Sequence, residues 1–75
     1  MNNEANFEER FKIFRNASRD FISVLNKAAP YNDKEWHGQR LTKVEQSEYM
    51  RILDELGVAI AERRAALEAV QDARD

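Results

Sequence analysis

The chain has 75 residues, a formal net charge of −2 and 35% charged side chains, so it is one small domain, and bulk charge gives it no general affinity for nucleic acid or membranes. It contains no cysteine, which excludes disulfides and thiolate metal sites. No N-terminal apolar run resembles a signal peptide or reaches the length of a membrane span, so we expect a cytoplasmic protein. Helix formers dominate beside two glycines and one proline, which favours an all-α fold.

The first helix is predicted over about residues 6–29. Asn6 and Glu9 form a capping pair at its start, with Asn3 as the competing start. Pro30 is expected to end it, because proline lacks a backbone N–H and disfavours the helical region for the residue before it. Its apolar face steps by three and four residues, as a helix face does. The stepping residues are Phe7, Phe11, Phe14, Ser18, Phe21, Leu25 and Ala28.

Residues 30–41 are predicted to connect two helices. This connection is longer than the usual 2–8 residues and is unusually aromatic. Residues 33–36 could form one helical turn that Gly38 stops. We expect Tyr31, Trp36 and Leu41 to fold back over the open end of the hairpin.

The second helix is predicted over residues 42–73, and Thr42 with Glu45 has the pattern of a capping box at its start. Arg63 interrupts its apolar face. The residues of that face are Tyr49, Leu53, Leu56, Ile60, Leu67 and Val70, widened by Ile52, Ala59, Ala66 and Ala73.

The two spacings predict a left-handed antiparallel hairpin. In the expected register Phe21 faces Leu53 and Phe14 faces Ile60. Ser18 then lies opposite Gly57, which suggests a close approach of the two backbones. The same register sets Arg63 against Phe11.

A two-helix hairpin of this size is marginally stable by itself, so we expect a homodimer, most simply a four-helix bundle. The second helix is apolar on a second side as well, and two apolar sides indicate two packing partners. The predicted dimer interface consists of Ile52, Val58, Ala61, Ala65 and Ala69.

His37 is the only histidine, and Glu35 is two residues before it. One histidine beside a carboxylate makes neither a metal site nor a catalytic pair, and no serine has a matching base and acid. We therefore expect a protein that is not an enzyme and uses no metal or cofactor.

Trp36-His37-Gly38 places a Trp-x-Gly motif between two helices. This resembles the secreted Trp-x-Gly family of helical hairpins, which type VII systems export as dimers. The resemblance covers three residues and the hairpin layout. The chain is shorter than those proteins and lacks their C-terminal Tyr-x-x-x-Asp/Glu signal, since its last tyrosine is Tyr49.

Lys12, Arg15 and Arg19 form a basic strip on the outer side of the first helix. The simplest interpretation is a solvated face balanced by nearby carboxylates. The alternative is RNA contact by a helical-hairpin dimer, as in plasmid copy-number regulators of the Rop type, which are similar in layout only.

The main functional hypothesis is a protein-binding module that regulates or inhibits a host or partner protein, for example a bacterial transcription factor, and is encoded by a bacterium or bacteriophage. A secretion co-chaperone would have the same features. Tryptophan and tyrosine are frequent anchors of protein interfaces. The partner-binding candidates are Tyr31, Trp36, Tyr49, Met50 and Arg63.

Overall fold

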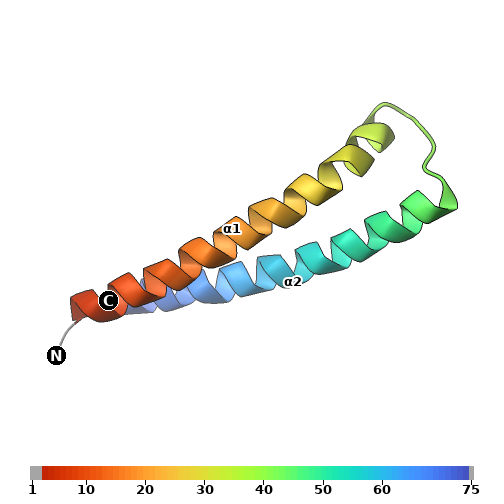
Figure 1. Cartoon of the computed structure of the whole chain (residues 1–75). Helices are drawn as coiled ribbons and strands as arrows, with labels where there is room; N and C mark the ends of the chain where they lie inside the picture. The colour runs from red at the N-terminus through yellow and green to blue at the C-terminus, as the bar shows by residue number, and fades with distance from the viewer. Residues whose placement is uncertain (1–2, 75) are drawn as a thin grey trace.

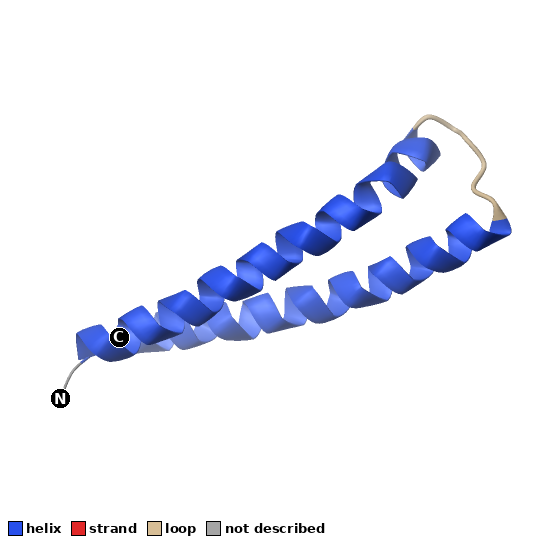
Figure 2. Cartoon of the chain, viewed as in Figure 1, coloured by secondary structure: helices blue, strands red, loops and turns tan. Residues whose placement is uncertain are grey.

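A computed structural model describes residues 3–74, with side chains from residue 6 onward. Two helices, α1 (Asn3–Trp36) and α2 (Lys43–Arg74), run antiparallel and are joined by residues 37–42 (Figure 1). No strand occurs between residues 3 and 74 (Figure 2). The hairpin is a rod of 57 × 18 × 15 Å, and the predicted all-α hairpin is confirmed.

α1 does not end at Pro30 as predicted but continues to Trp36. Proline removes one helical hydrogen bond, the one that the carbonyl of Asn26 would accept. Tertiary contacts on both sides of the proline offset this loss. Ala28 is buried, and the ring of Tyr31 stacks on a tyrosine of α2. Packing against α2 therefore holds two further turns in helical form.

The two helix starts differ in how well they follow the sequence. Asn6 is not the N-cap, because α1 already includes Asn3, the competing start. The capping box of α2 is confirmed. The Thr42 N–H donates to Glu45 Oε1 at 2.9 Å, and the Glu45 N–H donates to Thr42 Oγ1 at 3.1 Å.

Gly38 stops α1, as the sequence indicates for this position. Its φ of 72° lies in the left-handed region that glycine enters without steric cost. The Gly38 N–H donates to the Glu35 carbonyl at 3.0 Å, and the Gln39 N–H donates to the Lys34 carbonyl at 2.8 Å. This pair of bonds is a Schellman motif, so the helix end is well satisfied.

The predicted register between the helices is wrong. Arg63, rather than Ile60, lies opposite Phe14, with its guanidinium carbon 5.3 Å from the centre of that ring. The same carbon is 5.5 Å from the centre of the Phe21 ring, which was expected to face Leu53. The physical reason is the extension of α1 past Pro30. It moves the centre of the turn to a later position in the sequence. Each residue of α1 therefore faces a residue of α2 that lies further toward the C-terminus than predicted.

The expected close approach at Gly57 is also wrong. Ser18 faces Arg63, whose Nε donates to Ser18 Oγ at 3.1 Å. A Cβ built on Gly57 meets no atom within 4 Å, so this glycine lies on an open surface. Packing within the hairpin therefore does not require a glycine at this position.

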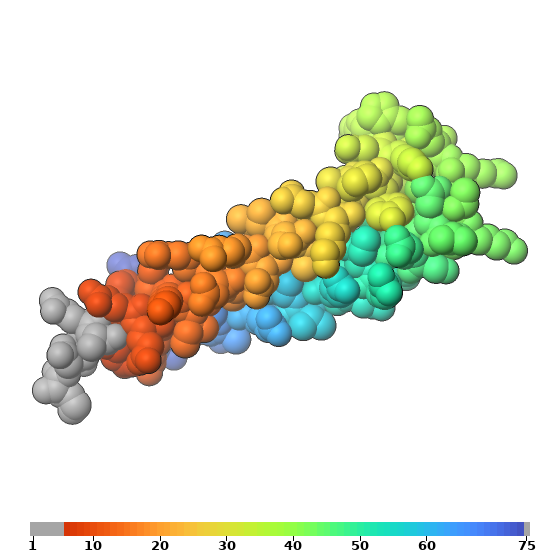
Figure 3. Space-filling model, viewed as in Figure 1, coloured from red at the N-terminus to blue at the C-terminus, as the bar shows by residue number. Residues whose placement is uncertain are grey.

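The seam, where α1 and α2 meet, contains few large side chains. Among the described residues no large side chain is fully buried. α2 faces α1 with its alanine row, while Leu53, Ile60 and Leu67 remain 37%, 43% and 37% exposed. Figure 3 shows the two helices lying along each other over the length of the rod. The buried apolar residues are Ala28, Ile52, Ala59, Ala66 and Val70.

Candidate functional site

Trp36 is 85% exposed at the end of α1, so the expectation that it folds back over the hairpin is wrong. Tyr31 points toward α2, and a residue five positions later in a helix projects about 140° away from it. The Schellman motif at Gly38 directly follows Trp36. The indole is therefore displayed to solvent from the end of an ordered helix.

Tyr31 and Tyr49 stack on each other across the two helices. Their ring centres are 5.6 Å apart with an interplanar angle of 17°, and the stack bridges the helices near the connection. The Tyr31 hydroxyl donates to Glu48 Oε2 at 2.8 Å. This hydrogen bond, with some desolvation, raises the pKa of Tyr31. Met50 directly follows Tyr49 in α2 and is 60% exposed.

Lys34 and Glu45 tie the last turn of α1 to the first turn of α2. Lys34 Nζ donates to Glu45 Oε2, and the other carboxylate oxygen accepts the Thr42 N–H. These two bonds, the one from Lys34 first, hold the pKa of Glu45 below its ordinary value. The ion pair lies within one turn of Trp36, and thus fixes the base from which the indole projects.

His37 takes part in the turn itself. Its Nδ1 lies 2.7 Å from the Asp33 carbonyl oxygen. A carbonyl only accepts, so Nδ1 carries the proton and the ring helps to close the end of α1. No group of three or more His, Cys, Asp or Glu side chains within the described residues could hold a metal ion.

Arg63 does not belong to the connection end. The predicted register set it against Phe11, but its guanidinium lies over the rings of Phe14 and Phe21, and its Nε donates to Ser18 Oγ. The flat guanidinium stacks on aromatic faces, which accommodates a charge in an apolar seam. Arg63 is therefore separate from the aromatic residues with which it was grouped.

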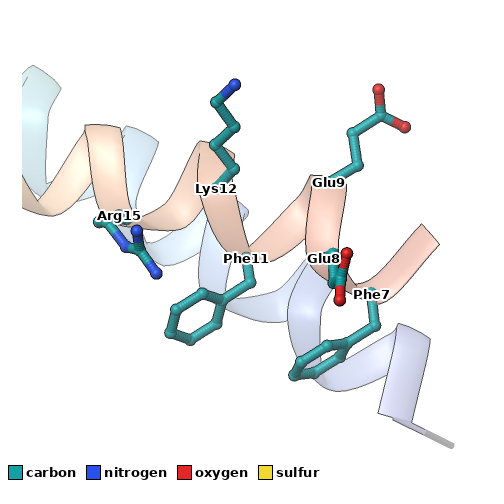
Figure 4. Close-up of a pocket in the computed structure, with 6 residues that line it drawn as sticks. All are labelled: Phe7, Glu8, Glu9, Phe11, Lys12 and Arg15. Carbon is teal, nitrogen blue, oxygen red and sulfur yellow. The ribbon is translucent and has the colours of Figure 1, made fainter. Parts of the chain in front are cut away.

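The basic strip does not form one continuous surface. Figure 4 shows Lys12 and Glu9 pointing away from the side on which the Phe7 and Phe11 rings lie. Arg15 instead lies over the Phe11 ring, 5.3 Å from its centre. Arg19 is seven residues after Lys12 and so projects in a similar direction. The three cations thus face in two directions.

The predicted dimer interface is divided by the structure. Ile52 is 8% exposed, so the hairpin itself already covers most of its surface. The Ala69 carbonyl accepts a 2.9 Å bond from Arg10 Nη1 across the seam. Val58, Ala61 and Ala65 are exposed on α2, and Ala65 lines a hollow together with Ile13 of α1.

Sequence reasoning missed a different apolar surface, because it placed Leu53, Ile60 and Leu67 in the seam. These residues recur every seven positions directly after Ile52, Ala59 and Ala66. Two adjacent rows with the same seven-residue period are equally compatible with the side of the helix that faces α1. Only the difference in side-chain size between the rows could have indicated which of them lies in the seam. The sequence does show this difference, because a row of large aliphatic side chains lies beside a row that consists mostly of alanine.

Comparisons with models of protein families, with curated proteins and with solved structures found no match. Within residues 3–74, neither helix is long and apolar enough to cross a membrane.

Proposed function

We propose that the chain is a small, non-enzymatic, cytoplasmic protein-binding module that regulates or inhibits a target protein by docking on it with the connection end. The observation that supports this most strongly is Trp36, which is 85% exposed. Exposing a large aromatic side chain to water is costly, and tryptophan is the residue most enriched among interface hot spots. Trp36 would insert into an apolar pocket of the target.

The surroundings of Trp36 favour docking over a flexible role. The Lys34–Glu45 ion pair, the Tyr31–Tyr49 stack and the Schellman motif hold this end in one conformation. A preorganised anchor loses little conformational entropy on binding, which increases affinity without further contacts. Met50, which is 60% exposed, supplies additional apolar area on the second turn of α2.

The test compares wild type with Trp36→Ala and Val44→Ala as immobilised baits, followed by titration calorimetry with the captured protein. Val44 is the matched control, because it is also apolar and exposed at the same end. We expect Trp36→Ala to weaken target binding by about 30-fold or more, as truncation of a hot spot costs at least about 2 kcal/mol. Val44→Ala should change it by less than about threefold. Equal affinity of wild type and Trp36→Ala would contradict the proposal.

Replacing Lys12, Arg15 and Arg19 together by glutamine separates this function from RNA binding. Docking through the connection end should be unchanged, because these residues lie in the N-terminal half of α1, away from the connection. Loss of function in this variant, with the target still bound, would favour the RNA hypothesis.

A further inference from the structure

One side of the hairpin is apolar along most of its length. We define the apolar face as five side chains, Phe11 and Leu25 of α1 and Leu53, Ile60 and Leu67 of α2. Their exposed fractions are 37, 40, 37, 43 and 37% respectively, so each keeps more than a third of its surface open. These are large side chains that a hairpin in isolation leaves partly in water.

The members of the apolar face lie on the same side of the rod. Ile60 and Leu67 line a hollow of about 320 Å³ together with Arg63, and Arg63 donates to Ser18 of α1. Every remaining member is seven residues from Ile60 or from Ser18. Residues seven apart share one side of a helix that packs with a 3.5-residue seam.

The opposite side mixes charged side chains with aliphatic ones such as Ile13, which is 57% exposed. Lys27 Nζ lies 3.7 Å from Glu55 Oε2 there, and Glu62 and Ala65 line a shallow hollow on the same side. Val58 is seven residues before Ala65 and therefore belongs to this side. The large apolar side chains at heptad spacing on both helices thus belong to the apolar face, whereas the opposite side carries an ion pair and scattered aliphatic residues.

The order of side-chain sizes in α2 is unfavourable for a hairpin alone. Ala59 and Ala66 fill the seam, while the larger Ile60 and Leu67 next to them are left outside it. A helix with apolar residues at both seam positions and at one adjacent position in each heptad is typical of bundles, where it contacts two neighbours. The row of Leu53, Ile60 and Leu67 lies where a second pair of helices would bury it.

The surface area supports the same conclusion. The chain exposes 6143 Å², whereas a folded monomer of 8.8 kDa is expected to expose about 4,800 Å². The excess is about 1,300 Å² per copy. A stable interface removes about 800 Å² from each partner, so a dimer would remove more than half of this excess.

We propose that a second copy of the chain covers the apolar face, so that two hairpins form a four-helix bundle with their apolar faces packed together. This interface includes residues of both helices and excludes Val58, Ala61 and Ala65. It goes beyond the proposed docking function and does not depend on it, since Trp36 is not a member of the apolar face.

Charge selects the orientation of the two copies. Arg63 and Arg64 are adjacent, and both line the hollow beside Ile60. Arg15 lies at the same level of the rod as Arg63, because Arg63 contacts the ring of Phe14 and Phe14 directly precedes Arg15. A parallel pair would place six guanidinium groups at one level, and like charges facing each other are destabilising. The two hairpins therefore run antiparallel.

The test compares Ile60→Glu with Val58→Glu by light scattering across a range of concentrations. Both are exposed aliphatic residues of α2, but only Ile60 belongs to the apolar face. Wild type and Val58→Glu should have twice the 8.8 kDa mass of one chain. Ile60→Glu should raise the dimer dissociation constant at least about 100-fold, because each copy loses a buried isoleucine and gains a buried carboxylate.

A monomeric wild type would overturn the proposal, and so would dissociation by Val58→Glu but not by Ile60→Glu. A second measurement needs no destabilising substitution. Isotope-filtered NMR on a mixture of labelled and unlabelled wild-type chains should show intermolecular contacts at the methyl groups of Ile60 and Leu67. Intermolecular contacts at Val58 with none at Ile60 would also overturn it.

The orientation is tested with one spin label at Gln39→Cys in the connection, since the chain has no other cysteine. Antiparallel copies place the two labels near opposite ends of a rod that is 57 Å long. Labels close together would contradict the antiparallel arrangement. Trp36→Ala should retain the wild-type mass, so loss of target binding and loss of the dimer are distinguishable.

Discussion

Arg63 shows how a single charged residue fits an apolar seam. Its guanidinium contacts the rings of Phe14 and Phe21, and its Nε satisfies Ser18. Arg63 also lines the hollow beside Ile60 and Leu67, and its side chain is only partly buried. The charge is thus placed at the boundary between seam and surface, where solvation is partly retained.

Gly57→Ala should stabilise the fold. Gly57 is helical, and an added Cβ meets nothing within 4 Å, so only the gain in helix propensity remains, about 1 kcal/mol. Urea denaturation measures the change. Gly38→Ala is the contrasting variant, because its φ of 72° is strained for alanine and it should lose about 1 kcal/mol. A destabilised Gly57→Ala would indicate a close contact at that position.

Glu45 should make stability depend on pH under acidic conditions. Lys34 and the Thr42 N–H hold its pKa in the folded state below the ordinary 4.5. Its contribution is therefore complete above the unfolded-state pKa and is lost as the pH falls through the lower folded-state pKa. Glu45→Gln should flatten the loss of stability between about pH 5 and pH 3 in denaturation series, whereas Glu62→Gln should leave it nearly as steep. If the stability of wild type and of Glu45→Gln fell equally steeply with decreasing pH, the result would contradict this prediction.

At the scale of the element, α1 is a helix whose last two turns are maintained by contacts rather than by local preference. Pro30 disfavours helix at that point, yet residues 31–36 remain helical because Tyr31 stacks on Tyr49 and Lys34 binds Glu45. These same turns position Trp36. The proposed docking site therefore depends on tertiary contacts made by only a few side chains.

Pro30→Ala should stabilise the hairpin by up to about 3 kcal/mol, because it restores an N–H for the Asn26 carbonyl and removes the clash of the proline ring. Chemical denaturation followed by circular dichroism measures the gain. Asn32→Ala, an exposed substitution in the same segment, controls for helix propensity and should gain less than about 1 kcal/mol. No gain in Pro30→Ala would mean that residues 31–36 are not helical in solution.

At the scale of the whole molecule, the hairpin has a seam but hardly a core. Its buried apolar residues are small or of medium size, and its larger ones line the apolar face instead. A protein of this size needs additional burial to be stable, and with no cysteine it has no disulfide to supply it. The proposed self-association through the apolar face would provide that burial and would leave the connection end free for the proposed target.

The sequence by itself determined the features that depend on neighbouring residues. The all-α hairpin, the extent of α2, its Thr42–Glu45 cap and the stop at Gly38 follow from hydrogen bonds and conformational preferences within about five residues. The stacking of Tyr31 on Tyr49 was also predictable, because both lie close to the turn.

Only the tertiary structure decided where α1 ends, which residues face each other, and which α2 row fills the seam. Contacts with α2 outweigh the local effect of Pro30, and the two additional turns displace the register. The choice between the alanine row and the row of Leu53, Ile60 and Leu67 depends on how closely α1 approaches. Both rows share one period, so periodicity alone could not distinguish the seam from the apolar face.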